Sequence, residues 1–185
     1  MLPTSATCSY TSEFRGSNDS HVMHSIDYII IDNVTIIENT SIVFNKSIVI
    51  EPTGVLVFRN SYISFSNMSV DPRLIPYGSL ILENSTLYAP KLRIYAFSSN
   101  SAYISANISI LHSNITIFYL DLEYYDNAPA PYKVLVDSSY INVSGGDILF
   151  RGIENLTVGS SFFSLDCFIG YVQYIHMVES VFCST

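Results

Sequence analysis

The sequence is poor in charge, and its basic residues are especially scarce. Charged residues make up 13% of the chain, only 8 residues are Lys or Arg, and the formal net charge is −8. Nucleic-acid binding needs a basic face that neutralises phosphates, so we expect none. Attachment to anionic lipid is disfavoured for the same reason. No apolar run reaches the roughly 18 residues that a membrane-spanning helix needs, so we expect no membrane insertion.

Motifs of common catalytic sites are also missing. The chain has no glycine-rich phosphate loop, no nucleophile elbow and no Cys-x-x-Cys pair. His21 and His24 have a spacing that suits metal on a helical turn, but their segment lacks helical character and a third ligand. We therefore expect a protein that is not an enzyme and has no metal site. The opening MLPTSATCSYTSEF does not read as a signal peptide, so a secreted form would have lost its leader.

Cysteines are few and odd in number, which excludes a disulfide-dense scaffold. Cys167 and Cys183 lie in neighbouring repeats and could pair, which would leave Cys8 free or bonded to another chain. Alternatively, Cys183 is simply a small buried residue.

What the sequence does contain is a repeated phrase, clearest in GVLVFRNSYI (54–63) and GSLILENSTL (78–87). The central part of the phrase spans six consecutive positions. These hold, in order, an apolar residue, any residue, Asn or Ser, any residue, Thr or an aromatic residue, and an apolar residue. The copies are IDNVTI, FRNSYI, LENSTL, VDSSYI, VGSSFF, VESVFC and a looser LHSNIT, anchored at positions 33, 60, 84, 138, 160, 180 and 113. A repeat of roughly 20–30 residues is typical of a solenoid, and its Val, Ile, Thr, Tyr and Phe content predicts strands.

The repeat predicts an all-β fold, a right-handed parallel β-helix of about seven rungs over residues 26–185, after an irregular lead-in or cap over 1–25. The phrase recurs in one orientation, and no Asn-Gly or Asp-Gly hairpin turn is present, which favours parallel stacking. A β-sandwich or jelly roll is the alternative. In a parallel stack the anchoring Asn or Ser of each level would form a polar ladder, and the apolar positions would form a continuous core.

Asparagine usage indicates an extracellular protein. Ten of 13 Asn head an Asn-x-Ser/Thr sequon, where chance would give about three. Turn chemistry explains part of this excess, because Asn-Ser belongs to the repeated phrase. The predicted glycosylation sites are Asn18, Asn33, Asn39, Asn45, Asn67, Asn84, Asn107, Asn114, Asn142 and Asn155.

The stretch NVTIIENTSIVFNKSIVIEPTGVLVFRNSYISF resembles the opening of secreted archaeal right-handed parallel β-helix surface glycoproteins. The resemblance covers roughly residues 26–183. It implies the coil but says little about activity, since that family is similar to adhesins and surface-layer components as well as to polysaccharide-acting enzymes.

One segment, FYLDLEYYD (118–126), is a candidate binding site. In an extended chain Asp121 and Glu123 would share one side, flanked by Tyr119 and Tyr125, while the leucines face the core. With Asp126 these groups could bind a sugar or Ca²⁺, or act as a catalytic carboxylate pair. A plain polar outer face is the favoured interpretation of the pattern, and no basic residue lies within this segment for lyase chemistry.

The last copy of the phrase ends two residues before the end of the sequence, and no capping segment follows it. An uncapped solenoid exposes backbone groups and core, so either the chain was cut from a longer protein or another chain covers this end, and we expect head-to-tail self-association. Together these observations predict a self-associating extracellular structural glycoprotein of a cell-surface filament, appendage or surface layer. The alternatives are a carbohydrate-binding or polysaccharide-cleaving β-helix and a virion surface or fibre protein.

Overall fold

A computed structural model describes residues 28–66, 71–98, 107–124, 130–143, 148–151, 153–164, 167–169 and 172–182. Every regular element within these ranges is a β-strand, and every strand pair is parallel. The predicted β-solenoid is therefore confirmed, and the sandwich alternative is excluded because its strands pair antiparallel. The predicted lead-in over residues 1–25 lies outside the described residues.

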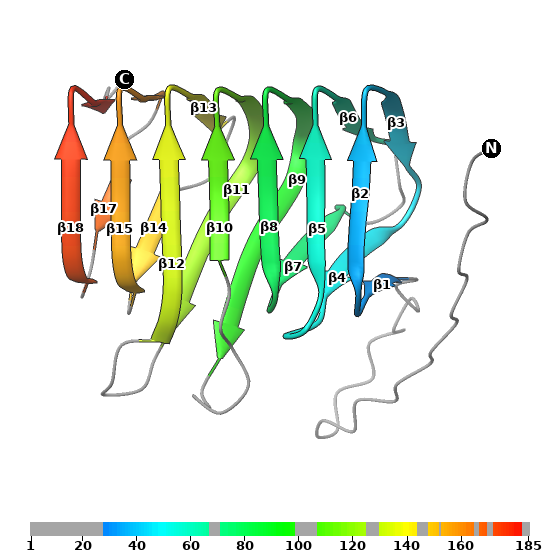
Figure 1. The fold of residues 1–185 in the computed structure, drawn as a ribbon, viewed down its shortest axis with the longest axis horizontal. Helices are drawn as coiled ribbons and strands as arrows, with labels where there is room; N and C mark the ends of the chain where they lie inside the picture. The colour runs from blue at the N-terminus through cyan, green and yellow to red at the C-terminus, as the bar shows by residue number, and fades with distance from the viewer. Residues whose placement is uncertain are drawn as a thin grey trace.

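Seven parallel strands form the front layer of the solenoid, one for each level (Figure 1). In spatial order they are β18 (Val172–Val178), β15 (Ile153–Gly159), β12 (Ala130–Asp137), β10 (Asn107–Leu111), β8 (Ser79–Glu83), β5 (Val55–Arg59) and β2 (Val34–Glu38). We call this layer the front sheet.

A 12-stranded sheet lies behind it and carries the return path of the chain (Figure 1). Its strands are β1 (Tyr28–Ile31), β3 (Ser41–Phe44), β4 (Ser47–Ile50), β6 (Tyr62–Phe65), β7 (Arg73–Pro76), β9 (Thr86–Ser98), β11 (Asn114–Tyr124), β13 (Tyr140–Val143), β14 (Ile148–Arg151), β16 (Phe162–Phe163), β17 (Cys167–Ile169) and β19 (Val181–Phe182). Within the described residues the last level, β18–β19, has no counterpart of β14 or β17. Fewer than seven turns are therefore complete, slightly below the predicted count.

The core follows from strand alternation, because every second residue of a strand points to the same side. In the front sheet one inward ladder runs through Leu80, Ile108, Val134 and Leu156, which are register partners and at most 3% exposed. The return strands supply the opposing side chains, such as Ile94 and its neighbours in the same cluster. Each level thus buries apolar groups only against its neighbours, which is why a single rung could not be stable alone.

Two glycines open front strands because the chain passes very close to the preceding level there. A Cβ on Gly54 would overlap the backbone carbonyl of Ile31, and one on Gly78 would overlap the carbonyls of Glu51 and Gly54. The glycine that begins both GVLVF and GSLIL therefore serves close backbone approach.

Candidate functional site

The corner, which we define as the turn joining each front strand to the following strand of the second sheet, repeats one backbone geometry on all seven levels. One non-glycine residue per corner has a positive φ of 43° to 53°. These residues are Asn39, Asn60, Asn84, His112, Ser138, Ser160 and Glu179. Asn and His tolerate this left-handed region better than most residues, whereas Ser and Glu are less common there.

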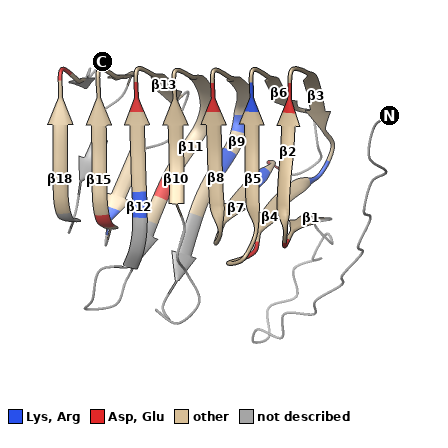
Figure 2. Cartoon of the chain, in the orientation of Figure 1, with Lys and Arg blue, Asp and Glu red and all other residues tan. Residues whose placement is uncertain are grey.

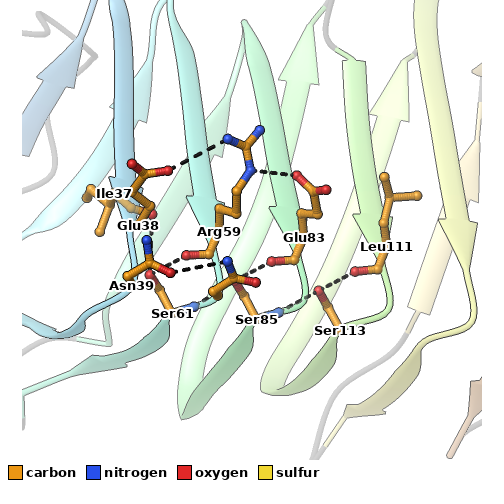
Figure 3. Close-up of polar contacts among 10 residues, drawn as sticks. Ile37, Glu38, Asn39, Arg59, Ser61, Glu83, Ser85, Leu111 and Ser113 are labelled. Carbon is orange, nitrogen blue, oxygen red and sulfur yellow. Dashed lines mark hydrogen bonds and ion pairs between the residues drawn. The ribbon is translucent and has the colours of Figure 1, made fainter.

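At five of the seven corners the residue after the turn residue is a buried serine that links adjacent levels (Figure 3). At the first corner Thr40 follows Asn39, and at the last corner Ser180 is half-buried. The backbone N–H of Ser61 donates to Oγ of Ser85 at 3.2 Å, and that of Ser85 donates to Oγ of Ser113 at 3.1 Å. Ser139 and Ser161 continue the same chain of hydrogen bonds. Each hydroxyl in turn donates to the carbonyl two residues before it, for example Ser113 to Leu111 at 2.7 Å. A polar ladder therefore runs along the corner, but its members are the serines after the turn residues, and of the predicted anchors only Ser113 belongs to it.

The structure corrects the register of the predicted phrase at three of its copies. The first corner is at Asn39 and not at Asn33, since Ile37 pairs with Phe58 and Ser41 with Tyr62. Likewise, the turn residues of two later levels precede the predicted anchors by one position: His112 rather than Ser113, and Glu179 rather than Ser180. The turn is defined by backbone conformation and by the serine that follows, so residue type alone misplaced it.

Charges at the corner alternate along the first three levels (Figures 2 and 3). Arg59 Nε donates to Glu83 Oε2 at 2.8 Å, and its Nη1 lies 3.7 Å from Glu38 Oε2. The hydrogen bond and the charge of Glu83 raise the pKa of Arg59 above its ordinary value. Glu38 and Arg59 are exposed and Glu83 is only half-buried, so this row contributes little stability.

A hollow of about 540 Å³ runs along the corner over the later levels. Its rim carries polar side chains, among them Asn84, His112 and Asn114. The rings of Tyr140 and Phe162 also line it, stacked 5.0 Å apart with planes only 2° from parallel. Sequence reasoning did not identify this hollow, although the aromatic residue after the paired serines in VDSSYI and VGSSFF is the signal that marks it.

The candidate segment 118–126 differs from its expected geometry. Leu120, Asp121 and Leu122 are each at most 3% exposed, so Asp121 does not lie on an exposed polar face. Its Oδ2 accepts a 2.8 Å hydrogen bond from the Tyr119 hydroxyl. The side chain of Glu123 and both Tyr125 and Asp126 lie outside the described residues, so sugar or Ca²⁺ binding there stays a prediction. Within the described ranges no three His, Cys, Asp or Glu side chains group as metal ligands.

Most of the predicted sequons present their asparagine to solvent. Of those that the structure describes, Asn33, Asn39, Asn45, Asn84, Asn107 and Asn114 are exposed. Asn142 and Asn155 are half-buried, and Asn142 Oδ1 accepts a 2.7 Å hydrogen bond from Ser164. Asn18 and Asn67 lie outside the described residues. So do Cys8, Cys183 and the two histidines His21 and His24, while Cys167 is on β17.

Core positions become exposed on the last level that the structure describes. Ile175 and Met177 of β18 are register partners of Leu156 and Val158, which are fully buried. Yet Ile175 is 51% exposed and Met177 is 37% exposed. The inward side of β18 therefore exposes apolar side chains, whereas the equivalent side chains of each inner level are covered by the next level.

Comparisons with protein-family models, with curated proteins and with solved structures return no match. The described part of the chain also contains no helix long and apolar enough to cross a bilayer.

Proposed function

We propose that the protein is a structural subunit that associates with further copies of itself, head to tail, in an extracellular glycosylated assembly such as a surface filament, appendage or layer. The observation that carries the proposal is the exposed inward face of β18. The density of sequons supports the extracellular location. The same contact would serve a virion fibre.

The register of the front sheet supports a second copy as the occupant of that face. Following the strand pairs from level to level, Met177 falls at the ladder position of Ile37, and Ile175 at that of Thr35. Placing β2 of one copy beside β18 of another would continue the parallel sheet and bring these side chains together. Their burial would be favourable at about 25 cal/mol per Å² of apolar surface.

The outer face of the same strands is not part of the apolar contact. Ile36 on β2 is 54% exposed, and His176 occupies its ladder position on β18. The edges of β2 and β18 carry backbone groups that such a contact would pair. Because the contact is heterologous and need not close into a ring, it would propagate as a filament.

Electron microscopy and sedimentation velocity of the full chain test the proposal. We expect filaments with an axial repeat of about 34 Å, from seven levels at about 4.8 Å each. Met177→Lys should remain folded but disperse, because Met177 is partly exposed in a free copy, whereas stacking would bury the added charge.

The matched control is His176→Lys, which adds the same charge on the outward side of the same strand and should still assemble. A parent protein that stays monomeric at every concentration would refute self-association. Equal assembly by Met177→Lys would refute this interface.

A further inference from the structure

Asn114 and Tyr140 are register partners on neighbouring levels of the corner. Asn114 heads the sequon Asn114-Ile115-Thr116, and its side chain is exposed. Tyr140 is 41% exposed, and one face of its ring is covered by the parallel ring of Phe162 on the next level. Because the rings stack along the ladder, the other face of Tyr140 is turned toward the level of Asn114.

The corner hollow lies at this open face. The ladder positions before Tyr140 carry the small side chains of Asn114 and Thr86, which leave space that an aromatic residue would fill. The volume of about 540 Å³ falls in the range of sites that hold small organic ligands. His112 and Ser138 on the rim offer hydrogen-bonding groups to a hydroxyl-rich ligand.

We propose that Asn114 carries an N-linked glycan whose first sugar lies in this hollow against the open face of Tyr140. This inference rests on the proposed extracellular location, which gives the chain access to a glycosylating machinery. The Nδ2 atom of Asn114 bonds to the anomeric carbon of a lipid-diphosphate-linked oligosaccharide. The bond from that carbon to the diphosphate oxygen breaks, the lipid diphosphate leaves with the electron pair, and Nδ2 loses one proton.

Ring chemistry explains why the sugar would stay at this place. The face of an aromatic ring carries negative partial charge, and the C–H groups on one face of a sugar carry positive partial charge. The sugar would therefore cover the exposed face of Tyr140 with its apolar side, and its hydroxyls would face the polar rim.

The sequons of Asn107 and Asn155 lack this combination. Asn107 is exposed, but its ladder partner on the next level is Lys133 rather than an aromatic residue. Asn155 has Tyr174 as its partner but is half-buried, and its Oδ1 accepts a 3.2 Å hydrogen bond from Thr157. Asn107 is therefore the natural control for a glycan without a stacking partner.

The experiment uses the full chain, secreted with an added leader from an N-glycosylating host. Mass spectrometry after enzymatic deglycosylation in heavy-oxygen water would report the occupancy of each sequon. Thermal unfolding is then compared for the parent, Asn114→Gln, Tyr140→Ala and the double variant. We expect an occupied Asn114 and a fall in Tm of about 2–4 °C on loss of its glycan in the parent, but no fall in the Tyr140→Ala background.

A second readout does not depend on the stability of the Tyr140 variant. Nitration of Tyr140 in the parent, followed by peptide mapping, should be slow with the glycan present and fast after deglycosylation. Asn107→Gln should leave that rate unchanged.

The outcomes separate this inference from the proposed function. If other sequons are occupied but Asn114 is not, the inference is overturned and the glycoprotein proposal stands. The same holds if Asn114 carries a glycan that does not slow nitration of Tyr140 and whose effect on Tm is the same in the Tyr140→Ala background. If no sequon is occupied, both the glycan site at Asn114 and the proposed glycosylation of the protein are refuted. Filament formation is then judged separately by microscopy.

Discussion

The backbone N–H of Ser85 donates to the hydroxyl oxygen of Ser113, 3.1 Å away and one level further along the solenoid. That hydroxyl also donates to the carbonyl of Leu111 at 2.7 Å. Both serines are at most 4% exposed. One buried hydroxyl thus accepts from a donor of one level and donates to an acceptor of its own level, and this links each level to the next.

Replacing a serine of this ladder should therefore destabilise the fold. Ser139 accepts from the N–H of Ser113 at 3.1 Å and donates to the carbonyl of Asp137 at 2.7 Å. In Ser139→Ala the buried N–H of Ser113 loses its acceptor, which costs about 1–3 kcal/mol. Equilibrium denaturation with urea measures the change in the free energy of unfolding.

The adjacent serine provides the control. Ser138 is exposed, and its hydroxyl makes only a long 3.3 Å contact with the Asp137 carboxylate. Ser138→Ala should change the free energy of unfolding by less than about 0.5 kcal/mol. Equal effects of the two variants would contradict a stabilising role for the buried ladder.

A second prediction concerns the glycines at the start of the front strands. The alanine Cβ in Gly78→Ala would overlap two backbone carbonyls of the preceding level, which cannot move independently of the sheet. We expect a loss of about 1–3 kcal/mol in the free energy of unfolding, or more. Thermal or urea denaturation measures it.

Gly159→Ala tests whether backbone proximity is the cause. The nearest atom to its added Cβ would be the side-chain Oδ1 of Asp137 at 2.5 Å, and that side chain can rotate away. Its free energy of unfolding should stay within about 1 kcal/mol of the parent value. A Gly159 variant as unstable as the Gly78 variant would argue against this explanation.

The sequence was sufficient to predict the parallel coil. In a stack of similar levels, equivalent residues lie above one another, so the same phrase must recur once per level, and the spacing of its copies shows this. It was insufficient to locate every corner. Asn33 matches the phrase at every position, whereas the residues around Asn39 depart from it at Ser41, and yet the backbone turns at Asn39. His112 and Glu179 take the turn conformation without being Asn or Ser, so a search by residue type misses them.

Burial at the predicted binding segment could not be read from the sequence either. Strand alternation tells which side chains face the core, but it does not tell what covers the outer face of the sheet. Asp121 lies between two core leucines and is itself 2% exposed. The pairing of Tyr140 with Asn114 was equally hidden, since it depends on the register between residues 26 positions apart.

The third prediction follows from the burial of Asp121. Asp121→Ala removes the acceptor of the Tyr119 hydroxyl, and Tyr119→Phe removes the donor. Each should destabilise the fold by about 1–3 kcal/mol, and the double variant should lose less than the sum. Strict additivity in this double-mutant cycle would show that the hydrogen bond does not contribute. Any test of carbohydrate binding at this segment should accordingly use Asp121→Asn, which preserves shape, with folding checked by circular dichroism.

The last prediction concerns stability at alkaline pH. Burial raises the pKa of the Tyr77 hydroxyl above its ordinary value, and the nearby Tyr95, Glu51 and Tyr28 raise it further. The folded state therefore holds this proton more tightly than the unfolded chain, whose tyrosines titrate near pH 10. The stabilising contribution is complete below about pH 10 and is lost as pH rises through the folded pKa.

Tyr77→Phe removes the titrating group, so the free energy of unfolding should fall less steeply with pH above about 10 than it does in the parent. Urea denaturation at a series of pH values measures this slope. Tyr88→Phe, at a position 51% exposed, is the control for the loss of a phenol that the fold does not bury. If the slope of the free energy of unfolding against pH is unchanged in Tyr77→Phe, the alkaline sensitivity of the solenoid arises at other groups. Titration of Tyr77 would then not be linked to folding.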